Sequence, residues 1–122
     1  MKKVLVTGGL GFIGSNLIKI LLSKNYFVIN LDNLSYSANF YNSKDFNHSK
    51  KYKFIKCDLN NKSKISTILN KFKPKTIFNL AAETHVDRSI DGPEDFIKSN
   101  IFGVFNLLQS FRKYVLKNKN SK

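Results

Sequence analysis

The residues that could do chemistry begin near the start of the chain, in the segment TGGLGFIG. Gly8, Gly11 and Gly14 stand three residues apart in it. Glycine adopts a positive φ without strain, and its missing Cβ lets a ligand approach the backbone closely. Where such a loop joins a strand to a helix, the free N–H groups of the helix bind a pyrophosphate. The spacing favours a dinucleotide-binding loop over an ordinary glycine-rich turn.

Two carboxylates follow later apolar runs and could complete such a site. Asp32 lies 18 residues after Gly14, where a carboxylate accepts hydrogen bonds from an adenosine ribose and repels a 2′-phosphate. This position favours NAD over NADP as the cofactor. Asp58 follows another apolar run and either caps the next segment or contacts the adenine. The sequence leaves both interpretations of Asp58 open.

The apolar pattern predicts the elements that position these residues. Short apolar runs predict strands near residues 4–7, 26–31, 52–57 and 75–80. Helical spacing predicts three helices, with apolar positions at Phe12, Ile13, Leu17, Ile20 and Leu21; at Ile65, Ile68, Leu69 and Phe72; and at Phe96, Ile97, Ile101, Val104, Phe105, Leu108 and Phe111. The polar composition of residues 33–50 predicts a long connection between two strands. This order indicates an α/β fold, a Rossmann-like doubly wound parallel sheet of about four strands with flanking helices.

A polar segment, AAETHVDRSIDGP, follows the fourth predicted strand at residues 81–93. Together with TGGLGFIG, Asp32 and FIKSNIFGVFNLL, it makes the chain resemble the extended short-chain dehydrogenase/reductases, most closely the dTDP-glucose 4,6-dehydratases. The resemblance extends from Met1 to about Tyr114. It implies a sheet in the order 3-2-1-4, which is incomplete here because the fourth strand forms an edge.

The resemblance implies a role for each matching residue. The pyrophosphate would lie along Gly8, Gly11, Phe12, Ile13 and Gly14; the ribose beside Asp32, Asn33, Leu34 and Ser35; and the adenine beside Asp58 and Leu59. Leu80, Ala81, Ala82 and Thr84 would line the path to the nicotinamide, with Ser99 nearby, and Thr84 and His85 would contact the sugar nucleotide. Apart from the resemblance, the residue types of Asp87 and Arg88 favour a local hydrogen-bond and ion-pair network that shapes the loop over a contact with the ligand. Ala38 departs from the family, which usually has glycine at that position.

No catalytic residue is predicted in this chain. The family oxidises the sugar at C4 with NAD, eliminates water across C5 and C6, and returns the hydride to C6. The resemblance assigns this chemistry to a Tyr-xxx-Lys pair and an Asp-Glu pair beyond Lys122. Tyr52 and Lys56 match the spacing but lie on a predicted strand, where four residues span roughly 13 Å. Tyr114 and Lys117 have the wrong spacing.

We therefore expect the N-terminal portion of a dTDP-glucose 4,6-dehydratase, inactive alone. Residues 1–116 would form a partial NAD-binding Rossmann domain and residues 117–122 a polar tail, with the substrate domain absent. The full-length protein would bind dTDP-glucose and form a homodimer, for which the long helix at residues 96–111 is a candidate. Two alternatives stay open: a portion of another sugar-nucleotide epimerase or dehydratase, and a stand-alone nucleotide-binding module completed by a partner chain.

The amino-acid composition argues against several other kinds of protein. The 122 residues carry a formal net charge of +13, but Arg88 and Arg112 are the only arginines, so solvated surface lysines are favoured over a nucleic-acid face. The single cysteine, Cys57, provides no disulfide framework and no metal-ligand pair. No apolar stretch approaches the roughly 20 residues that cross a bilayer. We expect a cytoplasmic protein without a metal, nucleic-acid or membrane partner.

Overall fold

The computed structural model describes residues 1–34, 39–81 and 93–118, without the side chains at positions 95, 96, 98 and 99. The chain divides into two compact units. The first unit comprises Met1–Cys57 and Pro74–Ala81, and the second comprises Asp58–Lys73 and Ala82–Lys122. In the described part of the chain, no helix combines the length and the apolar character needed to cross a membrane.

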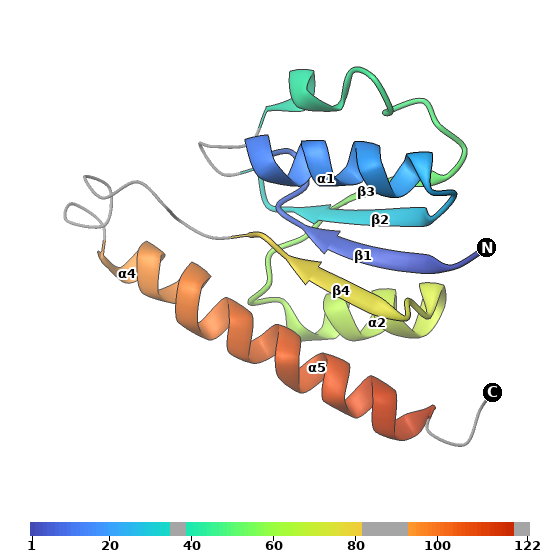
Figure 1. Cartoon of the computed structure of the whole chain (residues 1–122). Coiled ribbons are helices and arrows are strands. Elements are labelled where there is room, and N and C mark those ends of the chain that lie inside the picture. Colours follow the sequence, from blue (N-terminus) through green and yellow to red (C-terminus); the bar gives the residue numbers. More distant parts are fainter. Residues whose placement is uncertain (35–38, 82–92, 119–122) are drawn as a thin grey trace. The chain divides into compact units, whose positions relative to one another are not determined.

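A four-stranded parallel sheet forms the first unit, in the order β3-β2-β1-β4 (Figure 1). Its strands are β1 (Lys3–Thr7), β2 (Phe27–Asp32), β3 (Tyr52–Lys56) and β4 (Thr76–Asn79). The predicted strand positions and the predicted order are confirmed. The parallel pairing places the carboxyl ends of all four strands at one edge, where α/β sheets bind ligands.

The helix α1 (Phe12–Ser23) covers one face of this sheet. Ile18 and Leu21 pack in the core with side chains from β1 and β2. The predicted apolar face is only partly right, because Phe12 is 80% exposed and Ile13 is 70% exposed. The buried stripe passes instead through Gly14, Ser15, Ile18 and Leu21, which share one side of the helix at its period of 3.6 residues.

The predicted polar connection after β2 contains a short 3-10 helix, η1 (Phe40–Ser43). The Asn39 side chain accepts a hydrogen bond from the N–H of Tyr41 and begins this helix. Phe46 is buried and packs edge-to-face on Tyr52, with ring centroids 4.8 Å apart. The connection therefore contributes a core residue despite its polar composition.

Helices make up the second unit. Helix α2 (Lys62–Phe72) begins at Asn61, whose side chain accepts from the N–H of Lys64, and buries Ile65, Ile68 and Leu69 as predicted. The predicted last helix is interrupted: α4 (Pro93–Ile97) leads into a π-helical segment, η2 (Lys98–Phe102), and then into α5 (Gly103–Lys117).

The apolar side chains of this interrupted helix are partly outside the core. Ile97, Ile101, Phe105 and Leu108 are between 43% and 64% exposed. The buried positions of α5 are Gly103, Asn106 and Leu107, and Asn106 donates a hydrogen bond to Asn60 (3.2 Å). Helical spacing identified the apolar residues, but most of them line a solvent-exposed stripe.

Candidate functional site

The predicted glycine loop joins β1 to α1 and turns sharply at Gly8. Gly8 has a φ of +71°, and its N–H donates to the carbonyl oxygen of Leu31 on β2 (2.8 Å). A Cβ at Gly8 would lie 2.8 Å from backbone atoms of Leu80 and Ala81. Glycine is therefore required here by its conformation and by the close approach of the chain that follows β4.

Gly14 and Gly11 differ in whether a Cβ would fit at their positions. A Cβ at Gly14 would lie 2.3 Å from the carbonyl oxygen of Gly8, so glycine lets α1 pack against the loop. A Cβ at Gly11 would meet nothing closer than this same oxygen at 3.4 Å, which is an ordinary contact. Packing within the described chain does not require glycine at position 11. Glycine at this position is compatible with a ligand that approaches the backbone closely.

The N-terminus of α1 is suited to bind an anion. Gly11 occupies the N-cap position and provides no side-chain cap for the first N–H groups of the helix. These groups form the positive end of the helix dipole. Phe12 and Ile13 in this first turn are exposed, and their contact with the pyrophosphate stays a prediction.

Asp32 lies directly beside the glycine loop. One carboxylate oxygen, Oδ2, accepts from the N–H of Leu10 (3.0 Å), and Oδ1 accepts from the N–H of Leu34 (2.8 Å). A carboxylate has about four acceptor positions, so Asp32 retains acceptor capacity for the hydroxyl groups of a ribose. Leu34 has a φ of +59°, and the neighbouring Asn33 is exposed.

Leu80 and Ala81 are held at the loop by Thr7, which the sequence analysis did not identify. The buried Thr7 hydroxyl oxygen accepts from the N–H groups of Leu80 (3.0 Å) and Ala81 (3.1 Å), and the hydroxyl donates to Asn79 (2.5 Å). The signal in the sequence is a polar residue at the end of an apolar strand. These contacts hold the start of the chain after β4 against the turn at Gly8.

Three asparagines that support the loop were also missed. Gly9 donates its N–H to the side chain of Asn30 (2.9 Å). The carbonyl oxygen of Leu10 accepts from the N–H of Asn39 (3.1 Å) and from the side chain of Asn42 (2.9 Å). A signal was present for Asn30, which stands two residues before Asp32 inside an otherwise apolar strand.

Asp58, Leu59 and Ser99 belong to the second unit. The exposed carboxylate of Asp58 accepts from the backbone N–H of Asn60 (2.9 Å) and from its side chain (3.3 Å), so Asp58 stabilises a turn before α2, whose N-cap is Asn61. Leu59 is buried. The adenine contact stays a prediction. Ser99 lies in η2, but its side chain is outside the described residues.

Other predicted residues lie outside the described part of the chain. They are Ser35, Ala38, Ala82, Thr84, His85, Asp87 and Arg88. The structure therefore brings together Gly8, Gly11, Phe12, Ile13, Gly14, Asp32, Asn33, Leu34, Leu80 and Ala81 at the carboxyl edge of the sheet in the first unit. The predicted contacts of the sugar nucleotide with Thr84 and His85 remain predictions.

The two tyrosine–lysine pairs do not have the properties of a catalytic pair. Tyr52 and Lys56 lie at opposite ends of β3, as predicted. Burial raises the pKa of Tyr52, the nearby Asp32 adds to this increase, and a hydrogen bond from Asn30 opposes it. Burial also raises the pKa of Tyr114 on α5. A tyrosine that acts as a general base at neutral pH needs the opposite shift.

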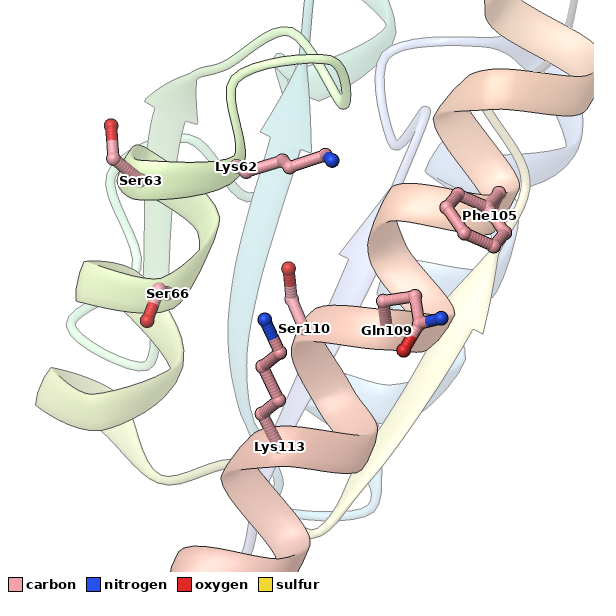
Figure 2. Close-up of a pocket in the computed structure, with 7 residues that line it drawn as sticks. All are labelled: Lys62, Ser63, Ser66, Phe105, Gln109, Ser110 and Lys113. Carbon is pink, nitrogen blue, oxygen red and sulfur yellow. The ribbon is translucent and has the colours of Figure 1, made fainter.

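The second unit contains an open pocket of about 480 Å³ between α2 and α5. It is lined by Lys62, Ser63, Ser66, Phe105, Gln109, Ser110 and Lys113. Lys62, Ser110 and Lys113 face the space between the two helices (Figure 2). No acidic side chain lines this pocket among the described residues, and none of the predicted site residues is part of it. Residues 1–34, 39–81 and 93–118 also contain no cluster of His, Cys, Asp and Glu that could hold a metal ion.

Comparison with known proteins finds relatives over nearly the whole chain. The dTDP-glucose 4,6-dehydratase of Escherichia coli is 44% identical over 115 residues, which cover 93% of this chain and 32% of the relative. The crystal structure of dTDP-glucose 4,6-dehydratase from Bacillus anthracis in complex with NAD has a TM-score of 0.82 and 34% identity, over 93% of this chain and 34% of that one. The chain thus spans about a third of the length of these proteins.

An epimerase is similar to the chain by the same measures. The structure of UDP-glucose 4-epimerase from Thermus thermophilus in complex with NAD has a TM-score of 0.80 and 34% identity, over 92% of this chain and 34% of that one. The family model for GDP-mannose 4,6 dehydratase matches residues 5–122. Because this match covers nearly all of the sequence, the chain belongs to the GDP-mannose 4,6 dehydratase family.

Proposed function

We propose that the chain is the NAD-binding portion of a dTDP-glucose 4,6-dehydratase, which converts dTDP-glucose to dTDP-4-keto-6-deoxyglucose and water. The observation that carries this proposal is the contact between Asp32 and the glycine loop. The Asp32 carboxylate accepts from the N–H of Leu10, so the acid predicted to bind the ribose lies next to the loop predicted to bind the pyrophosphate. The 44% identity to a dTDP-glucose 4,6-dehydratase supports the choice of enzyme.

Each part of the site has a distinct task in this proposal. The first N–H groups of α1 bind the diphosphate, with Gly11 leaving room for it. Asp32 accepts hydrogen bonds from the ribose hydroxyls and disfavours a 2′-phosphate by repulsion, which selects NAD over NADP. Thr7 holds Leu80 and Ala81 near the turn at Gly8. NAD supplies the hydride acceptor for sugar oxidation when it is bound.

We expect the 122-residue chain alone to bind NAD without turning over dTDP-glucose. Tyr52 and Lys56 are separated along a strand, and burial raises the pKa of the Tyr52 phenol. Neither property suits proton abstraction from a sugar hydroxyl. The contacts of Thr84 and His85 with the sugar nucleotide and of Ser99 with the nicotinamide remain part of the proposal.

A second candidate is a nucleotide-binding module completed by a partner chain. In the described part of the chain, β4 pairs with β1 on one side only, and its central residues Ile77 and Phe78 are half-buried. An open strand edge with apolar residues can pair with a further strand. A third candidate is a portion of a sugar-nucleotide epimerase, because the epimerase structure has the same 34% identity.

We further propose that the full-length protein forms a homodimer and acts in the cytoplasm. The exposed stripe of Ile97, Ile101, Phe105 and Leu108 supports the first proposal, because a continuous apolar surface on a helix suits a second copy of itself. The cytoplasmic location is supported by the single free cysteine, Cys57, since disulfides are typical of oxidising compartments.

Calorimetric titration of the 122-residue chain with NAD and NADP tests the proposed site. We expect NAD to bind and NADP to bind at least about tenfold more weakly. Asp32→Ala should reduce the preference for NAD by removing the charge that repels the 2′-phosphate. Lys53→Ala, on an exposed position of β3, is the control. Equal affinity of the wild-type chain for both cofactors would contradict the role of Asp32.

A turnover assay tests whether the 122-residue chain is inactive alone. The chain is mixed with dTDP-glucose and NAD, and formation of the 4-keto-6-deoxy product is followed by chromatography. We expect no product from the chain alone. Product formation by the pure chain would show that its own residues supply the catalytic groups, against the proposal.

A further inference from the structure

The glycine loop contains a fourth glycine, Gly9, outside the three-residue spacing. A Cβ at Gly9 would lie 2.2 Å from Oδ1 of Asn30 and 2.5 Å from Cδ1 of Ile18. The N–H of Gly9 donates to this Oδ1 (2.9 Å). Position 9 is therefore restricted to glycine by a side chain that approaches the loop from β2, and not by a ligand.

Asn30 is a buried amide in an apolar strand. Its side chain has no exposure to solvent, and burial of an amide is costly unless its polar atoms are hydrogen-bonded. Both ends of the amide have partners: Oδ1 accepts from Gly9, and Nδ2 donates to the hydroxyl oxygen of Tyr52 (3.0 Å). Because a backbone N–H can only donate, Oδ1 must face Gly9, and the orientation of the amide is fixed.

Asn30 and Asp32 act on successive residues of the loop. They stand two apart on β2, so they share one face of the strand. Asn30 holds the N–H of Gly9, and Asp32 holds the N–H of Leu10. The first half of the loop is thus fixed by β2. A fixed loop keeps the following N–H groups of α1 in place without a ligand, which reduces the ordering cost of binding.

We propose that Asn30 is a positioning residue for diphosphate binding, which holds Gly9 so that the first N–H groups of α1 are directed at the ligand. This inference rests on the proposed NAD site and adds a residue that does not touch the cofactor. The inference predicts a selective effect. Loss of Asn30 should lower the affinity for ligands that carry the diphosphate and leave the affinity for adenosine unchanged.

The test compares a variant that removes the amide with a variant that removes one of its partners. Asn30→Leu removes the bond to Gly9 and the bond to Tyr52. Tyr52→Phe removes only the second bond and serves as the matched control. Affinities for ADP and adenosine are measured by NMR titration of the ¹⁵N-labelled 122-residue chain, and stability is measured by urea unfolding.

We expect Asn30→Leu to weaken ADP binding about tenfold and adenosine binding less than about twofold. The amide exchange of Gly9 should accelerate in this variant. Tyr52→Phe should lose stability but keep the ratio of ADP to adenosine affinity. If Asn30→Leu does not fold, Asn30→Ser takes its place, because serine is smaller and leaves room for water. The ratio of ADP to adenosine affinity is then measured for Asn30→Ser.

The outcomes distinguish this inference from the proposed function. If the wild-type chain binds ADP and the Asn30 variants lose stability without a change in the ratio, Asn30 is only structural and the inference is overturned, while the NAD site stands. If the wild-type chain binds neither ADP nor NAD, the proposed function fails and the inference fails with it.

Discussion

Single residues in the glycine loop have different physical reasons for being glycine. Gly8 needs its positive φ and the space taken by Leu80 and Ala81, and Gly14 needs the space taken by Gly8. Gly9 accommodates Asn30. Within this loop, only at Gly11 does a Cβ fit among the described residues. We therefore expect substitutions within this one loop to separate the proposed ligand binding from folding.

Gly11→Ala and Gly14→Ala form a pair that tests this separation. We expect Gly11→Ala to reduce the free energy of unfolding by only about 1 kcal/mol, because its φ of −79° is allowed for alanine and only the preference for glycine at the N-cap is lost. It should weaken NAD binding at least about tenfold through contact with the diphosphate. Gly14→Ala should cost about 1–3 kcal/mol of stability by overpacking. Urea unfolding and calorimetry check both, and equal behaviour of the two variants would contradict the interpretation.

The Tyr52 phenol should make stability depend on pH in the alkaline range. Burial raises its pKa above the usual value of 10.0 in the folded chain. The unfolded chain then loses this proton first, so stability is fully present below about pH 10 and decreases as the pH rises through the folded pKa. The free energy of unfolding is measured for the wild type and for Tyr52→Phe from about pH 8 to about pH 11. Both proteins have the same lysines, so the difference between them isolates the contribution of Tyr52. The stability difference should be constant below about pH 10 and decrease above it; a constant difference throughout would contradict the shift.

The sequence was sufficient to predict those site residues that stand at the ends of strands. Gly8 follows β1 and Asp32 ends β2, and strand ends are visible in the apolar pattern. Thr7 was missed because its partners at Asn79, Leu80 and Ala81 lie more than 70 residues away. Their proximity depends on the pairing of β1 with β4, and hydrophobic periodicity carries no information on which side chains meet across strands.

At the scale of elements, helix positions were easier to predict than buried faces. The position of α2 and its buried residues agree with the pattern, because its apolar residues form one stripe against polar neighbours. In α1 and in the segment from α4 to α5, apolar residues occur on more than one side. In that case, hydrophobic periodicity does not distinguish a helix face that packs in the core from one that contacts a ligand or a partner.

The exposed stripe of α4, η2 and α5 predicts an effect of Leu108→Glu on assembly. Leu108 is 64% exposed. If the stripe joins two copies, a buried charge should weaken the dimer at least about 100-fold. Sedimentation velocity over a range of concentrations measures this change. Gln109→Glu adds the same charge beside the stripe and should leave the dimer intact. A full-length wild-type protein that stays monomeric at all concentrations would contradict the proposed interface.

At the scale of the whole molecule, the net charge of +13 gives the chain a positive field that attracts any polyanion. Weak binding of a DNA duplex is therefore expected, with an affinity that falls steeply as salt increases. Asp32→Ala should leave the salt dependence of duplex binding unchanged, because one carboxylate among many lysines does not form a specific contact with DNA. Filter binding at several salt concentrations checks this. A duplex affinity that survives high salt would instead indicate a dedicated nucleic-acid site.

The strand order has a consequence for the time course of folding. β1 is paired with β2 through Val4 and Val28, 24 residues apart, and with β4 through Val4 and Thr76, 72 residues apart. Contacts between distant residues form slowly, because a longer loop must be closed. During synthesis, β1, α1 and β2 can associate while β4 is still inside the ribosome. The nascent chain then carries Asp32 and the glycine loop before Leu80 and Ala81 arrive, so the contact of these two residues with the turn at Gly8 forms after the loop itself.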